Sequence, residues 1–164
     1  MDQVVSLEDG LRAGGVFYRV GGKDKESVIK EVVQIMPLPE EVDRAYLLEV
    51  LLARESLGST GIGEGIAIPH VRNPIVMHIP KPMVSLCFLE YPIEFDAIDH
   101  KPVHTLFAIV SPAIKAHLKL LSGLAFALRD PEFASVINRR GMRAEVFASA
   151  KRIDELVRPQ STQA

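Results

Sequence analysis

The sequence contains a single cysteine, Cys87, so no disulfide can form within the chain. It lacks a block of basic residues and its formal net charge is only −2, which argues against nucleic acid or an anionic membrane as a partner. No apolar run approaches the roughly 18 residues of a membrane-spanning helix, and the N-terminus lacks the apolar core of a secretory signal. We therefore expect a cytoplasmic protein in a reducing compartment, without direct membrane insertion.

Internal repeats and low-complexity segments are also missing. What is present is ordinary globular content, with 48% hydrophobic and 24% charged residues. A length of 164 residues suits one domain and suffices for one substantial hydrophobic core. We predict a single domain over residues 1–164 that ends in a short polar tail, "RPQSTQA".

Apolar patterning predicts strands at residues 16–20, 66–68, 83–90 and 103–111. Helices are predicted over about 23–36, 40–56 and 113–130, followed by shorter helices up to Leu156. This order does not alternate as in a doubly wound nucleotide-binding fold. We therefore predict an α/β fold with a mixed parallel and antiparallel sheet of about five strands between helices on both faces.

Two of these helices have a predicted apolar face. In the helix at 40–56 this face comprises Val42, Ala45, Tyr46, Glu49 and Val50, and in the long helix it comprises Leu118, Leu121, Leu124, Ala125 and Leu128. His117 lies one turn before Leu121, so we expect its side chain near the core.

The segment "GSTGIGEGIAIPH", residues 58–70, has four glycines within eight residues and ends in Pro69-His70. It is not a Walker loop, because no lysine follows the glycines, and Ile66 stands where a dinucleotide fingerprint needs a third glycine. A turn-rich connection between helix and strand is the plain alternative. Pro69 restricts the backbone before His70, so the imidazole is presented from a stiff main chain, as suits a nucleophile.

The longer segment "LLARESLGSTGIGEGIAIPH" resembles the phosphorylation-site signature of phosphotransferase-system enzyme IIA domains of the fructose/mannitol and nitrogen-regulatory type. The matching positions are Arg54, Glu55, Thr60, Gly61, Ile62, Gly63, Ala67, Ile68, Pro69 and His70. The likeness continues in "KPVHTLFAIVSP" and "AHLKLLSGLAFAL", so it covers a core of about residues 5–157.

The resemblance implies a phosphoryl carrier that needs no cofactor. It implies that His70 accepts a phosphoryl group, on Nε2, from the histidine-containing phosphocarrier protein. It also implies that His117, the second histidine of the family, stabilises the phosphoryl group and that Arg54 lies near the phosphohistidine. Taken without the resemblance, His117 is better explained as a hydrogen-bonded core histidine, and Arg54 equally well as a solvated charge at a helix C-terminus.

Phosphoryl transfer spreads charge over the equatorial oxygens, so donors and cations should surround the acceptor. Gly61 and Gly63 would let backbone N–H groups approach these oxygens, and Thr60 is either a hydroxyl donor or an ordinary turn residue. Arg72 keeps the basic residue that the family has after its histidine, and we count it as phosphate-binding. Val71 stands where the family has a small residue, and we expect this difference to affect which partner docks.

A metal site is the first alternative, because Asp96, Asp99, His100 and His104 are close in sequence. Pro102 argues against a helical pair of the two histidines, and no His-Glu-x-x-His motif occurs. We therefore predict no metal site.

The second alternative keeps the fold and changes the role. A transport-type protein passes the phosphoryl group to a cysteine of a sugar-specific IIB domain, whereas a regulatory protein binds other proteins according to its phosphorylation state. The sequence contains no IIB or membrane segment, which favours regulation. A domain that binds partners without being phosphorylated is disfavoured by the intact Pro69-His70 and His117.

Overall fold

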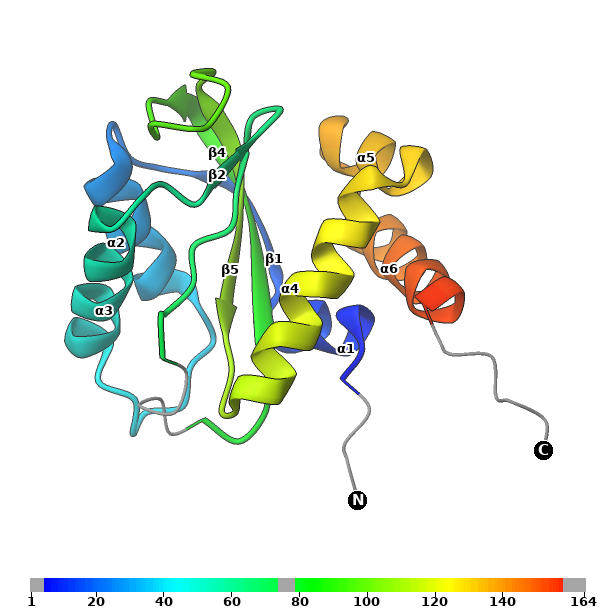
Figure 1. Cartoon of the computed structure of the whole chain (residues 1–164), viewed down its shortest axis with the longest axis horizontal. Coiled ribbons are helices and arrows are strands. Elements are labelled where there is room, and N and C mark those ends of the chain that lie inside the picture. Colours follow the sequence, from blue (N-terminus) through cyan, green and yellow to red (C-terminus); the bar gives the residue numbers. More distant parts are fainter. Residues whose placement is uncertain (1–4, 74–78, 158–164) are drawn as a thin grey trace.

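The computed structural model describes residues 5–73 and 79–157 (Figure 1). The sheet has five strands in the order β1-β4-β5-β3-β2. Its strands are β1 (Val16–Val20), β2 (Gly61–Gly63), β3 (Ile66–Ala67), β4 (Met83–Ile93) and β5 (Val103–Val110). The helices of the described ranges are α1 (Leu7–Gly14), α2 (Lys25–Ile35), α3 (Arg44–Ser56), α4 (Ile114–Arg129), α5 (Pro131–Asn138) and α6 (Arg143–Val157).

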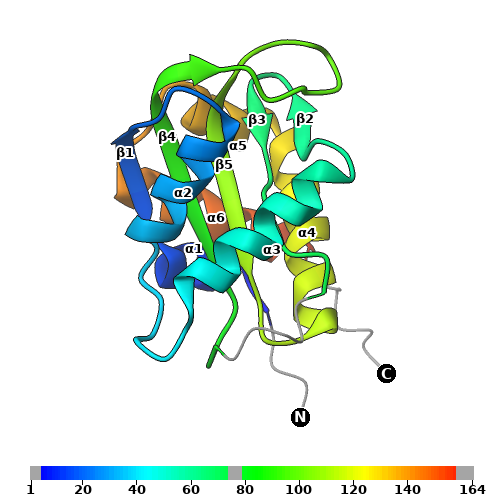
Figure 2. The ribbon, with the colours of Figure 1, turned by 90° about the vertical axis from the view of Figure 1, so that its left-hand side faces the viewer.

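The sheet is mixed, as predicted. β1 is parallel to β4, and β3 is parallel to β5, whereas the pairs β4–β5 and β2–β3 are antiparallel. Helices α2 and α3 cover one face, and α1, α4, α5 and α6 lie on the other (Figure 1; Figure 2 looks onto the face of α2 and α3). The α/β class with helices on both faces is therefore confirmed. None of the helices within these ranges combines the length and the apolar character needed to cross a bilayer.

The central strands β4 and β5 are buried on both faces, which explains their nearly continuous apolar runs. Cys87 lies inside β4 with no exposed surface, and this burial raises the pKa of its thiol to about 12. The thiol is therefore protonated and shielded from solvent, so it serves as a small apolar core residue.

The segment before β1 forms a helix that the sequence analysis does not predict. Helix α1 follows the N-cap residue Ser6, whose hydroxyl accepts a hydrogen bond from the N–H of Asp9 at 2.9 Å. The carboxylate of Asp154, on α6, accepts the N–H groups of Leu7 and Glu8 at 2.7 and 2.9 Å. The helix start is thus completed by a residue from the far end of the chain, which local pattern cannot show.

Helix α3 also differs from the prediction, because it begins at Arg44 rather than near residue 40. Asp43 caps it by accepting the N–H of Tyr46 at 3.1 Å. The predicted apolar face is wrong: the buried positions are Leu47, Leu51 and Glu55. Apolar residues surround most of this helix, so periodicity alone does not determine which stripe meets the sheet.

The predicted stripe of α4 is partly wrong for the same reason. Its buried residues are His117, Leu120, Leu124 and Ala127, whereas Leu118 is 58% exposed. The burial of His117 agrees with the prediction. Its neighbour Leu118 instead points away from the core.

Helix α1 packs tightly on the sheet at Gly14, where a Cβ would lie 2.2 Å from the carbonyl oxygen of Val84. The atoms nearest to this Cβ are backbone atoms of β4, which cannot move without disturbing the sheet. We therefore expect Gly14→Ala to lower the free energy of unfolding by about 3 kcal/mol. Gly123, within α4, has nothing within 4 Å of such a Cβ. Gly123→Ala should therefore raise the free energy of unfolding by about 0.5–1 kcal/mol through helix propensity.

Urea unfolding of both variants, followed by circular dichroism, measures this contrast. A wild-type midpoint for Gly14→Ala would contradict the tight contact between α1 and β4.

Candidate phosphoryl-transfer site

The orientation of His70 follows from strand alternation. Ile66 pairs with Thr105 and Ala67 with Leu106, and the same parallel register continues to a bridge between His70 and Ile109. Side chains of an extended segment alternate between the faces of the sheet. Ala67 and Val71 enter the core beneath α2 and α3, whereas Ile66 and Ile68 enter the core on the other face. His70 shares the parity of Ile68, so its side chain lies on the α4 side.

Val71 is fully buried among residues of α2 and α3. Its side chain thus secures the backbone on the opposite side of the segment from the imidazole. The valine that departs from the usual small residue is here a core residue, and it does not line the cavity described below.

One nitrogen of His70 has a defined partner. Nδ1 lies 2.7 Å from the carbonyl oxygen of Ile68. Because a carbonyl oxygen only accepts, this contact assigns the proton to Nδ1 and leaves the lone pair on Nε2. Burial lowers the pKa of His70, the Ile68 hydrogen bond opposes this effect, the charge of Arg54 lowers the pKa further and that of Glu55 raises it. The imidazole is therefore neutral near pH 7.

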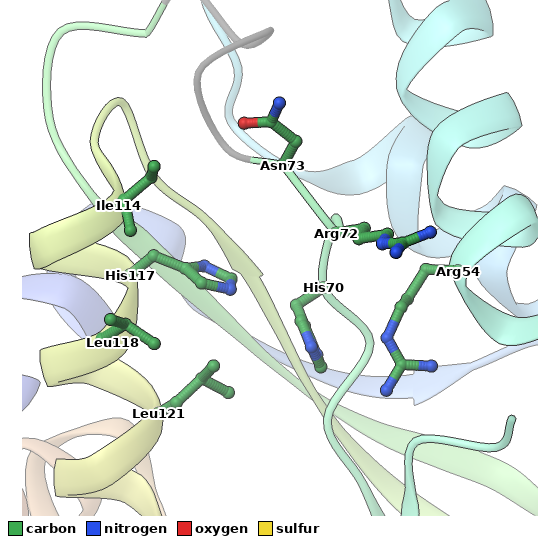
Figure 3. Close-up of a pocket in the computed structure, with 8 residues that line it drawn as sticks. All are labelled: Arg54, His70, Arg72, Asn73, Ile114, His117, Leu118 and Leu121. Atoms are coloured by element: carbon green, nitrogen blue, oxygen red, sulfur yellow. The ribbon is translucent and has the colours of Figure 1, made fainter. Parts of the chain in front are cut away.

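The second histidine lies beside the first. The ring centroids of His70 and His117 are 5.3 Å apart, at an interplanar angle of 48°. His117 is only 5% exposed, and burial together with the neighbouring His70 lowers its pKa to about 4. Its Nδ1 is buried and makes no hydrogen bond within the described part of the chain. Figure 3 shows the ring extending from α4 toward His70.

A cavity of about 670 Å³ opens over both histidines (Figure 3). Helix α4 forms one wall, with Ile114, Leu118 and Leu121. Arg54 and Arg72 line it from the other side of His70, and Asn73 lines it above His70 in the view of Figure 3, so the cavity has an apolar wall and a cationic wall.

Arg54 lies in the last turn of α3, and its Nη1 donates to the carbonyl oxygen of Gly58 at 2.7 Å. This bond holds the guanidinium at the end of the helix, where it lines the cavity. The structure therefore brings together His70, His117, Arg54 and Arg72.

The glycine run lies elsewhere, which corrects the expected phosphate cradle. Thr60 is 5% exposed, and its hydroxyl and N–H both donate to the carboxylate of Glu55. Gly61 and Gly63 form the edge strand β2, where the sequence analysis predicts no strand. A Cβ at Gly61 would lie 2.9 Å from Cα of Ala97, and Gly63 has a φ of +100°. These glycines permit close packing and a positive φ, and none of the three residues lines the cavity.

The residues considered for a metal site have separate partners. The carboxylate of Asp99 accepts the N–H groups of Glu64 and Lys101 at 2.9 and 3.1 Å. His104 Nδ1 lies 2.8 Å from the hydroxyl oxygen of Thr105. Among residues 5–73 and 79–157, no group of three or more His, Cys, Asp or Glu side chains is arranged to hold a metal ion.

Sequence reasoning missed the apolar wall and Glu55. The sequence pattern predicts Leu118 and Leu121 on the buried stripe of the helix, whereas both line the cavity. The one available signal is that Leu118 directly follows His117, the histidine expected near the site. Glu55 matches a position of the family signature, but the sequence indicates no function for its side chain. Its buried carboxylate, which accepts both donors of Thr60, became visible only in the structure.

Solved structures share this architecture. The crystal structure of nitrogen regulatory protein IIA-Ntr from Neisseria meningitidis is 29% identical with a TM-score of 0.72, and the match covers 82% of this chain and 92% of that chain. A chain in the complex of enzyme IIAMTL and phosphorylated enzyme IIBMTL from Escherichia coli has a TM-score of 0.62 at 22% identity, covering 84% of this chain and 94% of that one. The second likeness concerns the fold alone.

Curated relatives carry the comparison further. A nitrogen regulatory protein of Pseudomonas aeruginosa is 38% identical over 129 residues, which are 76% of this chain and 81% of the relative. A fructose-specific EIIABC component of Bacillus subtilis is 35% identical over 116 residues, 69% of this chain but only 18% of that larger protein. Residues 11–152 match the family model "Phosphoenolpyruvate-dependent sugar phosphotransferase system, EIIA 2". With most of its length inside that match, the chain belongs to the EIIA 2 family of the phosphoenolpyruvate-dependent sugar phosphotransferase system.

Proposed function

We propose that His70 is the residue on which this phosphotransferase-system carrier holds its phosphoryl group. The observation that carries the proposal is the 2.7 Å contact between Nδ1 and the Ile68 carbonyl oxygen, which leaves Nε2 as a neutral nucleophile. His117 and two guanidinium groups adjoin the same cavity, where a phosphoryl group on Nε2 would find both a donor and positive charge.

The proposed donor is the phosphohistidine of the histidine-containing phosphocarrier protein, met in the cytoplasm. The lone pair on Nε2 forms a bond to phosphorus while the donor's P–N bond breaks, and the donor imidazole keeps the electron pair of that bond. No cofactor enters this exchange. Arg54 and Arg72 would stabilise charge on the equatorial oxygens, since catalysis of such a step is mainly positioning and electrostatics.

The role proposed for His117 depends on its neutrality. With a pKa of about 4, the ring is uncharged near neutral pH and carries one N–H. We propose that this proton sits on Nε2, from which it can donate to a phosphoryl oxygen. The buried Nδ1 then holds the lone pair.

Replacement of the proposed acceptor should abolish phosphorylation. In a mixture of phosphoenolpyruvate, enzyme I and the phosphocarrier protein, we expect one acid-labile phosphate on the wild type and none on His70→Ala, because the other imidazole of the cavity, His117, has its Nδ1 buried and its Nε2 assigned here as the N–H donor. Intact-protein mass spectrometry at neutral and acid pH measures this. The matched control is His100→Ala, which changes an exposed histidine outside the cavity and should leave phosphorylation intact. Phosphate retained on His70→Ala would contradict the assignment.

Loss of the second histidine should have a different effect. We expect His117→Ala to accept phosphate on His70 but to pass it onward about 10²-fold more slowly, since one donor to the transferring group is lost. Rapid-quench measurement of the phosphorylated protein with its acceptor determines the rate. Onward transfer at the wild-type rate would remove His117 from the mechanism.

We further propose a regulatory role for the phosphorylated and unphosphorylated forms. Support comes from the Pseudomonas relative, a nitrogen regulatory protein that matches over 76% of this chain. The alternative is a sugar-transport component that donates to a cysteine of a separate IIB domain. It is supported by the fructose-specific relative from Bacillus subtilis.

The two roles differ in what the phosphorylated protein meets. For a regulator, affinity capture from its own cells should recover a protein outside the sugar-transport systems, in amounts that differ between wild type and His70→Ala. Recovery of a IIB domain, with phosphate passing from His70 to its cysteine in a purified mixture, would establish the transport role instead.

A further inference from the structure

We propose that Glu55 is a positioning residue for His70: its buried carboxylate holds Thr60, and through Thr60 and Ile68 it fixes the imidazole of the phosphoryl acceptor. The inference rests on the proposed function of His70. It concerns a residue outside the cavity, since Glu55 does not line the cavity although its neighbour Arg54 does.

The environment of Glu55 shows that its carboxylate is held by specific donors. The residue is 7% exposed and lies in the last turn of α3. Oε1 accepts the hydroxyl of Thr60, and Oε2 accepts the Thr60 N–H at 3.2 Å. The ammonium of Lys25 lies 3.3 Å from Oε2 and supplies the compensating charge. A buried carboxylate is stable only with such partners, so this group is fixed in place.

Lys25 is itself fixed from several sides. Its ammonium lies 4.7 Å from the centroid of the Phe95 ring and 3.6 Å from the carboxylate of Asp96. The start of α2, the end of α3 and the loop after β4 therefore meet at Glu55. This convergence gives the carboxylate a rigid base.

From Thr60 the hydrogen bonds lead directly to the acceptor. The N–H of Ile68 donates to the carbonyl oxygen of Thr60 at 3.0 Å, and Nδ1 of His70 donates to the carbonyl oxygen of Ile68 at 2.7 Å. Thr60 and Ile68 flank the β2–β3 hairpin, so their contact closes it. Glu55 holds Thr60, on one side of the contact that closes the hairpin. The carbonyl group of Ile68, which orients the imidazole of His70, lies on the other side.

The charge of Glu55 adds to its positional effect. Two charged side chains at the end of α3, Arg54 and Glu55, act on the pKa of His70. The ring of His117 on α4 lies 5.3 Å away, and Arg72 lines the same cavity. Glu55 raises the pKa of His70 and Arg54 lowers it, so adjacent residues of one helix act on the imidazole with opposite sign. Without the carboxylate, the imidazole should become less basic.

A carboxylate that merely stabilised the fold would not change the tautomer of His70, and this distinction can be measured. Nitrogen NMR of histidine-labelled, unphosphorylated protein reports which ring nitrogen carries the proton and at what pH the ring titrates. In the wild type we expect the proton on Nδ1. The two donors of Thr60 bind different oxygens of Glu55, and in Glu55→Gln one of these acceptors becomes an NH₂ group that can only donate. The pair of bonds to Thr60 is then not kept in place, and the negative charge opposite Lys25 is lost.

For Glu55→Gln we therefore expect a smaller share of the Nδ1–H tautomer, a lower pKa of His70 and phosphoryl acceptance slowed on the order of 10- to 100-fold. The matched control is Glu49→Gln, the same chemical change at an exposed position of α3, which should leave all three quantities unchanged. A folded Glu55→Gln protein with the wild-type tautomer and acceptance rate overturns the inference.

A second pair of variants keeps the test informative if Glu55→Gln does not fold. Thr60→Val removes only the hydroxyl donor and should shift the tautomer in the same direction, whereas Thr60→Ser keeps the hydroxyl and should restore wild-type behaviour. A Thr60→Val protein with an unchanged tautomer counts against the inference. The proposed function can fail separately. If the wild-type protein never takes up phosphate, yet the tautomer of His70 still changes in Glu55→Gln, the proposed function is overturned and the positioning role of Glu55 stands.

Discussion

The parallel pairing of residues 66–70 with β5 determines on which face of the sheet the side chain of His70 lies, and with it the place of the proposed chemistry. Ile66, Ala67 and His70 lie opposite Thr105, Leu106 and Ile109 in one unbroken register. A shift of one residue would exchange the two faces, placing Val71 beside α4 and His70 in the apolar core beneath α3. The buried Val71 makes such a shift costly, because the imidazole would replace an aliphatic side chain among apolar neighbours. The register therefore selects both the face on which His70, the proposed nucleophile, lies and its distance from His117.

The electrostatic arrangement follows from the same placement. Burial keeps His70 and His117 neutral, so the proposed acceptor has a lone pair to offer and the two rings do not repel each other at 5.3 Å. The positive charge of the cavity comes from the guanidinium groups of Arg54 and Arg72. Arg54 and Glu55 are neighbours in sequence, yet one lines the cavity and the other is buried behind the hairpin. The last turn of α3 thus supplies a cation to the cavity beside His70 and, in the proposed positioning role of Glu55, an anchor for the backbone that presents the imidazole.

The sequence was sufficient to predict the mixed sheet, the burial of His117 and the pairing of the two histidines that the family resemblance implies. It was insufficient wherever distant parts of the chain complete a local element. Helix α1 depends on the carboxylate of Asp154, and the stripe that α4 buries depends on the sheet beneath it. The use of the glycine run at residues 58–65 could not be predicted for a different reason. Closely spaced glycines are equally suited to cradling an anion and to letting two backbones approach, and only the position of Ala97 against Gly61 decides between these uses.

The two walls of the cavity explain how one modification can change recognition without changing the fold. A phosphoryl group brings up to about two negative charges at neutral pH and would lie between the guanidinium groups and the apolar residues of α4. Ile114 and Leu118 are 49% and 58% exposed, so a partner can contact the apolar wall in either state. The charge facing the partner differs between the states, because the phosphoryl group would add negative charge beside the guanidinium groups of Arg54 and Arg72. A partner that tolerates only one of these charge patterns would distinguish the two forms by electrostatics at a single rigid surface.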